Sequence, residues 1–156
     1  MFLQYFTSRL VESTTGELFH LSTANLDTLT IYPSIPDNSM VINGYEDGIT
    51  PRISLAPTIG QCLRGFAQNI KGMEFYVHVP VSIPPVVKPT IKQVPDAQVT
   101  GEVWSMTPIT MKCVGLIRVT NARSEPSTFK YGDGSAASYA WNYQWVSKND
   151  TRVLPK

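Results

Sequence analysis

The sequence predicts a small mixed α+β domain that consists mostly of strands, with one or two short helices. With 156 residues the chain is long enough for one domain with a core and short for two, so residues 1–156 are expected to form a single domain. Several segments alternate apolar and polar residues with the period of two that is typical of strands. Only one segment combines a helix start with apolar residues at helical spacing, so strands dominate the prediction.

Outside residues 51–72, strands are expected in four parts of the chain. Residues 18–21, LFHL, place successive side chains on opposite strand faces. Residues 73–81, MEFYVHVPV, alternate in the same way, and His78 is expected to be half-exposed there. Residues 100–120 predict two strands that are broken near a Thr-Pro pair, and residues 139–146, YAWNYQWV, predict a strand with one packed aromatic face.

Residues 51–72, PRISLAPTIGQCLRGFAQNIKG, carry a short strand followed by the helix. Pro57 and Thr58 suit a helix start, and the apolar residues that follow recur at helical spacing. Gly72 is expected to end this helix. The regions expected to lack regular structure are residues 40–50, an exposed loop, and the proline-rich residues 81–95, an extended connector.

The composition and the motif content exclude several function classes. The formal net charge of +1 argues against a broad nucleic-acid surface, which needs many phosphate contacts. Cys62 and Cys113 lie far apart without a CxxC partner, so they are expected to be reduced, buried thiols rather than a disulfide or metal ligands. The sequence has no GxGxxG, P-loop or HExxH motif, and GDGSA around Ser135 lacks the spacing of a nucleophile elbow.

The setting of the protein is predicted from features that the sequence lacks. No segment has the apolar length that spans a bilayer, and the first residues lack the features of a secretory signal. We therefore expect a cytoplasmic protein without a membrane partner. The low charge and the single small domain are consistent with an origin in a phage or a mobile element.

Three segments taken together suggest a known family. FHLSTANLDTL contains His20, Leu21 and Ser22, TPRISLAPTIGQCL contains Arg52 and Ser54, and TGEVWSMTPITMKCVGLIRVT contains Glu102. In order and approximate spacing these segments resemble the three motifs of the histidine-type ADP-ribosyltransferases, the branch of diphtheria toxin and the poly-ADP-ribose polymerases. The motifs span about two thirds of the chain.

The resemblance implies a split, two-sheet antiparallel fold and an enzyme that uses NAD as a substrate. Such an enzyme would cleave the nicotinamide–ribose bond and transfer ADP-ribose to a macromolecule or to water. Glu102 takes the position of the catalytic carboxylate, which stabilises positive charge at the anomeric carbon. His20 and Ser22 take positions that contact the riboses of NAD, and the backbone of Leu21 takes the position that holds the nicotinamide amide. His20, Ser54 and Glu102 should then meet in one cleft.

Arg52, near the start of the second of these segments, has two interpretations. Its guanidinium could pair with the pyrophosphate of NAD. As a lone arginine before a strand, it could equally be a surface residue that forms a salt bridge with Glu46 or Asp47.

Two positions depart from the family pattern and keep other functions open. Leu21 stands where the family has a Gly, and Ser54 stands where it has a Tyr that stacks on nicotinamide, so Tyr45 or Tyr76 would have to supply that platform. A second hypothesis is therefore an inactive module of the same fold that binds a nucleotide or a protein. A third is a small phage or mobile-element interaction protein with an aromatic docking strand. Independently of these hypotheses, Glu102 could simply be a solvated residue at the edge of a strand.

Overall fold

The computed structural model describes most of the chain as two antiparallel sheets with two short helices. The described residues are 10–11, 17–37, 39–44, 46–66, 69–95, 100–124 and 139–148. The prediction of a small domain made mostly of antiparallel strands is confirmed. Within these residues, no helix is both long enough and apolar enough to cross a membrane. Ser135, and with it the GDGSA segment, lies outside the described residues.

The first sheet contains four short strands in the order β1-β6-β7-β4. Their bounds are Leu10–Val11 for β1, Val86–Val87 for β6, Val103–Ser105 for β7 and Ile53–Leu55 for β4. The pairing of β4 with β7 places Ser54 directly opposite Trp104. The expectation that residues 81–95 form only a connector is wrong at β6, because its two apolar residues are buried and pair with neighbouring strands.

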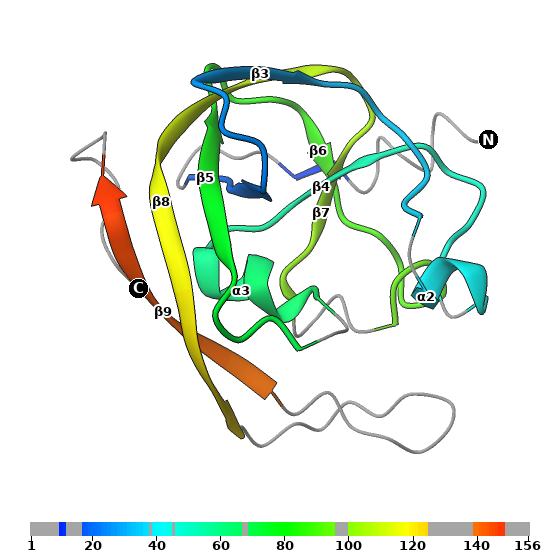
Figure 1. Cartoon of the computed structure of the whole chain (residues 1–156). Helices are drawn as coiled ribbons and strands as arrows, with labels where there is room; N and C mark the ends of the chain where they lie inside the picture. The colour runs from blue at the N-terminus through cyan, green and yellow to red at the C-terminus, as the bar shows by residue number, and fades with distance from the viewer. Residues whose placement is uncertain are drawn as a thin grey trace.

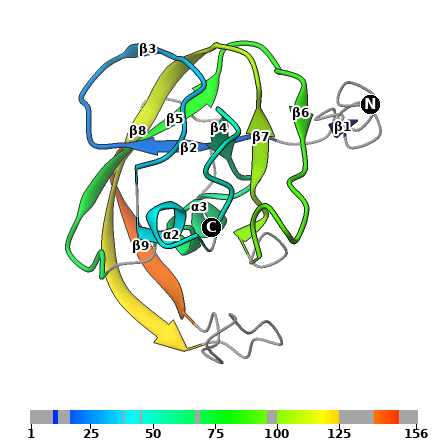
Figure 2. The same ribbon diagram turned by 90° about the vertical axis from the view of Figure 1, so that its right-hand side faces the viewer.

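The second sheet contains five strands in the order β2-β5-β8-β3, with β9 also paired to β8. Their bounds are His20–Ser22 for β2, Glu74–Pro80 for β5, Ile109–Ser124 for β8, Thr28–Ile31 for β3 and Tyr139–Lys148 for β9. Figures 1 and 2 show β5, β8 and β9 on one side of the molecule and β4, β6 and β7 on the other. The predicted break between two strands is confirmed, since β7 ends at Ser105 and β8 begins at Ile109.

Two pairs of backbone hydrogen bonds tie the sheets together near β4. Phe19, just before β2, exchanges hydrogen bonds with Ala56, just after β4, at N···O distances of 2.8 and 3.2 Å. Ser34, after β3, exchanges hydrogen bonds with Arg52 at 3.1 and 3.0 Å. The strand β4, which carries Ser54, is therefore hydrogen-bonded at both ends to the second sheet, at one end to the segment before β2 and at the other to the segment after β3.

The helix α3, Ile59–Arg64, packs its apolar side against the second sheet. It begins at Thr58, whose Oγ1 accepts a hydrogen bond from the amide of Gln61 at 3.1 Å. Ile59 and Leu63 are fully buried in a core cluster with valines of β5 and β8. The prediction that Gly72 ends the helix is wrong, because α3 ends at Gly65, whose amide donates to the Cys62 carbonyl in a tighter turn.

A one-turn helix, α2, covers Ser39–Ile42 inside the segment predicted to be a loop. It ends at Gly44, whose backbone φ is +79° and whose amide donates to the carbonyl of Val41 at 3.1 Å. The other described residues of that segment are irregular, so among them the prediction is wrong only for this single turn, where a glycine that follows allows the turn to close.

The prediction for β9 is confirmed, because three aromatic residues pack against the core cluster of α3 and β5. They are Trp141, Tyr143 and Trp145. Gly115 of β8 lies under this strand, and a Cβ atom at Gly115 would be 2.5 Å from the Ser147 carbonyl oxygen. A residue without a side chain is therefore needed where this end of β9 pairs with β8.

His78 is buried, so the prediction of a half-exposed strand histidine is wrong. The register of β5 against β8 shifts between Val77 and His78, and the loop before β3 covers the imidazole. Nε2 of His78 donates a hydrogen bond to the carbonyl oxygen of Leu26 at 3.0 Å. The alternation of the sequence could not reveal this loop, because residues far apart in the chain supply the cover.

Candidate functional site

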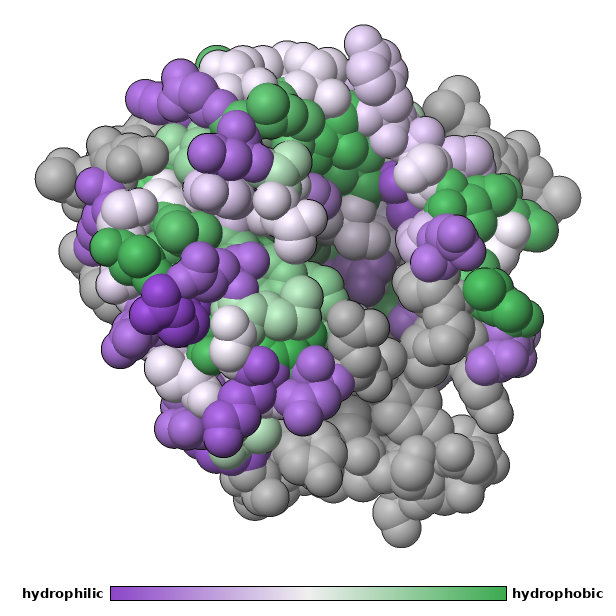
Figure 3. Space-filling model, in the orientation of Figure 1, coloured by the Kyte–Doolittle hydropathy of each residue, from purple (hydrophilic) through white to green (hydrophobic). Residues whose placement is uncertain are grey.

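A cleft of about 720 Å³ opens between the two sheets, beside α3. Figure 3 shows the molecule hollowed near the middle of this face, with hydrophilic residues inside the hollow. Five of the six residues predicted for the site line the cleft, namely His20, Leu21, Arg52, Ser54 and Glu102. Residues from segments more than eighty positions apart therefore meet here, as the resemblance led us to expect.

Glu102 is held on one wall of the cleft by two hydrogen bonds to the same oxygen. Its Oε2 accepts from Oγ of Ser54 at 2.9 Å and from Nε1 of Trp104 at 2.6 Å. The strand register explains this arrangement, because Ser54 and Trp104 are partners across β4 and β7 and Glu102 lies two residues before Trp104 on the same face. The carboxylate is thus oriented by two donors from the first sheet.

Gly101 lets the chain bring Glu102 to the cleft. Its backbone φ is +66°, a region that a glycine adopts without steric cost. A Cβ atom there would come within 2.3 Å of the side-chain nitrogen of Gln61 on α3. The backbone at Gly101 therefore passes close to α3, and the glycine of the Thr-Gly-Glu sequence is the feature that permits this approach.

His20 lies on the opposite wall, on β2. Its Nδ1 is 3.5 Å from the carbonyl oxygen of Ser54, a long hydrogen bond that links the two walls. Burial lowers the pKa of His20, and the nearby His78 lowers it further, although the hydrogen bond to Ser54 acts in the opposite direction. The imidazole is therefore neutral at pH 7, with one nitrogen that donates and one that accepts.

The neighbours of His20 on β2 differ in their placement. Leu21 lines the cleft and also packs against the core cluster of α3 and β5. Ser22 is not among the residues that line the cleft, and its Oγ instead accepts a hydrogen bond from the amide of Ala24 at 3.0 Å. The structure therefore places Ser22 at the end of β2, where its hydroxyl accepts from the turn that follows.

Arg52 is buried at one end of the cleft, with its charge already balanced. Its Nη1 donates to the carbonyl oxygens of Asp47 and Thr50 at 2.7 and 3.0 Å. Its guanidinium also lies 3.8 Å from the carboxylate of Asp47 and 4.0 Å from that of Glu46. The predicted partners Glu46 and Asp47 are correct, but the predicted surface location is wrong, since the arginine side chain has no exposed area.

Cys62 also lines the cleft, but as a packing residue. Its Sγ donates to the Phe19 carbonyl oxygen at 3.3 Å, and burial raises the pKa of this thiol to about 12. A thiol that stays protonated at neutral pH is a poor nucleophile. Both cysteines are free, as predicted. Within the described ranges, no group of three or more His, Cys, Asp and Glu side chains is placed to hold a metal ion.

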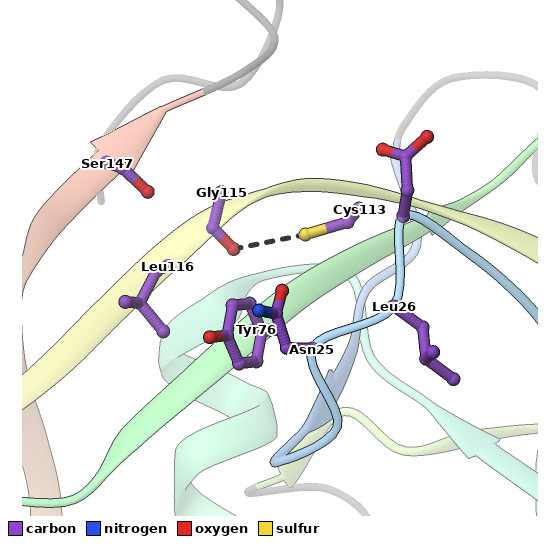
Figure 4. A pocket seen from close by; sticks show the side chains of 8 residues that line it. Asn25, Leu26, Tyr76, Cys113, Gly115, Leu116 and Ser147 are labelled. Atoms are coloured by element: carbon purple, nitrogen blue, oxygen red, sulfur yellow. Dashed lines mark hydrogen bonds between the residues drawn. The ribbon is translucent and has the colours of Figure 1, made fainter.

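Of the two tyrosines suggested as a nicotinamide platform, Tyr76 does not line the cleft. Tyr45 lies outside the described residues, and Tyr76 lines a separate pocket of about 310 Å³ with Asn25, Leu26 and Cys113 (Figure 4). The aromatic residues that do line the cleft are Tyr32, which is 67% exposed, and Phe66, which stacks on Phe75.

Sequence reasoning missed Trp104 as a residue of this site. The signal was present, because EVWS places Trp104 two residues after Glu102 and hence on the same strand face. An indole N–H needs an acceptor when it is buried, and Trp104 has no exposed area.

No protein-family model matches the chain, and neither a curated protein nor a solved structure is significantly similar to it.

Proposed function

We propose that the protein is an NAD-dependent ADP-ribosyltransferase that cleaves the nicotinamide–ribose bond and transfers ADP-ribose to a macromolecule or to water. The observation that carries the proposal is the hydrogen bond between Ser54 and Glu102, which sets an oriented carboxylate in a cleft across from a neutral His20. These are the residues that the three sequence motifs singled out.

Glu102 supplies the electrostatic part of the proposed reaction. When the bond between nicotinamide and the ribose carbon breaks, the bonding electron pair leaves with nicotinamide and positive charge develops on the sugar. A carboxylate already oriented by Ser54 and Trp104 stabilises that charge without reorganising. The acceptor oxygen then bonds to the anomeric carbon, and its proton is released to solvent.

The cleft has the size and lining that a dinucleotide needs. Its volume of about 720 Å³ lies in the range of small-molecule sites, which combine apolar walls with a few convergent polar groups. The apolar lining includes Ile31 and Phe66, and the polar groups include His20 and Glu102. A neutral imidazole at His20 can both donate to and accept from a ribose hydroxyl. Because Arg52 is already paired with two carboxylates, we assign it no contact with pyrophosphate.

The proposal is tested by nicotinamide release from NAD. Wild-type protein should release nicotinamide, and Glu102→Gln should reduce the rate by at least about 100-fold, since the loss removes charge stabilisation from the transition state. The amide keeps the shape and can still accept a hydrogen bond from Trp104, so the thermal midpoint should change little. An undiminished rate in a folded Glu102→Gln variant would refute the assigned role of Glu102.

A second candidate is a module that binds NAD or a related nucleotide without chemistry. The observation that favours it is the side chain of Leu21, which occupies part of the cleft where the family has a glycine. This candidate predicts that NAD raises the thermal midpoint of the wild-type protein while no nicotinamide is formed. Measuring both quantities on the same sample separates the two functions.

A further inference from the structure

We propose that Trp104 is a positioning residue for Glu102, held in place by the buried guanidinium of Arg52. This inference rests on the proposed function for its effect on rate, but its geometry can be tested without NAD. The structural feature is a continuous set of contacts that runs from Asp47 through Arg52 and Trp104 to the Glu102 carboxylate.

The contact between Trp104 and Glu102 has the properties of a charge-assisted hydrogen bond. The N···O distance of 2.6 Å is short, and the indole is fully buried. A hydrogen bond to a charged group contributes more than one between neutral groups, especially where water is excluded. Ser54 donates to the same oxygen from the exposed side of the cleft, so Trp104 is the donor on the buried side.

Arg52 fixes the plane of the indole. Its guanidinium carbon lies 4.4 Å from the centroid of the Trp104 ring, in cation–π contact. The indole also belongs to a small core cluster with Val87 and Val94. A ring in contact with a cation and packed with two valines cannot rotate its N–H away from Glu102 without breaking one of these contacts.

Asp47 fixes Arg52 in turn. One oxygen of Asp47 accepts from the amides of Ile49 and Thr50 at 2.7 and 2.8 Å, and the other accepts from the Thr50 hydroxyl at 2.7 Å. The Asp47 amide donates to the carbonyl of Gln93 at 2.8 Å, which ties this loop to the segment after β6. Although burial opposes it, these hydrogen bonds hold the pKa of Asp47 below its usual value, so it is ionised at pH 7 and balances Arg52.

A packing role alone does not account for this arrangement. Phenylalanine at position 104 would fill most of the same volume and would still present a ring face to Arg52. The indole adds one group, the N–H, and that group is directed at the one carboxylate of the cleft assigned to catalysis.

The rate test compares Trp104→Phe with Trp141→Phe. Trp104→Phe removes the donor and keeps a ring, so kcat for nicotinamide release should fall by about ten- to hundredfold, the usual effect of losing a hydrogen bond to a charged group, while KM changes less than about twofold. Trp141→Phe removes an indole of β9 that packs on the other core cluster and should leave kcat unchanged. A Trp104→Phe variant that keeps its kcat, or one that loses only stability, overturns the inference.

The geometric test uses the indole N–H resonances of the three tryptophans in an ¹H–¹⁵N spectrum. The resonance missing from Trp104→Phe identifies Trp104. In Glu102→Gln that resonance should move strongly, because the charged acceptor is replaced by a neutral one, while those of Trp141 and Trp145 stay in place. An unmoved Trp104 resonance overturns the inference. Absence of nicotinamide release by wild-type protein, with the Trp104 resonance moving as expected, instead refutes the proposed function alone.

Discussion

The two walls of the cleft are built differently. On the wall of β4 and β7, the Glu102 carboxylate accepts hydrogen bonds from Ser54 and Trp104, and the Arg52 guanidinium packs on the Trp104 ring. On the wall of β2, among the described residues, the imidazole of His20 has only a long hydrogen bond to a backbone carbonyl. One wall is therefore rigid at its polar group, whereas the other leaves its polar group able to adjust.

This difference fits the tasks assigned to the two walls. A group that stabilises charge in a transition state acts best when it is oriented beforehand, since reorientation would add to the barrier. A group that contacts a ribose in the ground state can adjust its position as the ligand binds. The two histidines show the same contrast within β2 and β5, because His78, the strand partner of His20, is fully buried and bonded to Leu26.

The largest effect, on the free energy of unfolding, is expected from a substitution in the wall of β4 and β7. Arg52→Met leaves the carboxylates of Asp47 and Glu46 without their buried cation, and losing one partner of a buried pair costs about 3–5 kcal/mol. The measurement is the free energy of unfolding in urea. Arg118→Met is the matched control, because the pair of Arg118 with Glu74 is exposed and should contribute less than about 1 kcal/mol. Equal losses in the two variants would show that the Arg52 pair is no more than a surface contact.

A smaller effect is expected from the adjustable wall. His20→Ala should raise the KM for NAD about tenfold, the effect of one lost ribose hydrogen bond, and lower kcat much less. The comparison variant is His78→Ala, which removes a fully buried side chain and should lower the free energy of unfolding more than His20→Ala does. If His20→Ala lowers kcat as strongly as Glu102→Gln, the contrast between the walls is wrong.

The smallest effect is expected in the pH dependence of stability that arises from the titration of His20. Burial lowers the pKa of His20 below 6.5, so the folded protein binds this proton less readily than the unfolded chain does. The contribution of neutral His20 to the free energy of unfolding is therefore complete above pH 6.5 and is lost as the pH falls through the folded-state pKa. Wild-type protein should therefore lose stability relative to His20→Asn as the pH falls below 6.5, measured by urea unfolding. A difference between the two proteins that does not change with pH would contradict this.

Much of the architecture could be predicted from local patterns. Residues close together in the sequence decide the alternation of β5 and β9, the break before Ile109 and the start of α3 at Thr58. The predictions failed where distant segments decide the outcome. His78 is buried by the loop around Leu26, and β6 forms because β7 offers it a partner.

The sequence by itself determined the polar candidates for the proposed nucleotide site, because its three segments carry His20, Ser54 and Glu102 in the order that the resemblance implies. It also determined that Glu102 and Trp104 share a face, since the period of a strand is two. Only the tertiary structure decided that Ser54 and Trp104 lie opposite each other, because strand register depends on pairing between segments about fifty residues apart. The same pairing decided that Arg52 lies between Trp104 and Asp47. There it is buried, its charge is balanced, and it holds the Trp104 ring in place.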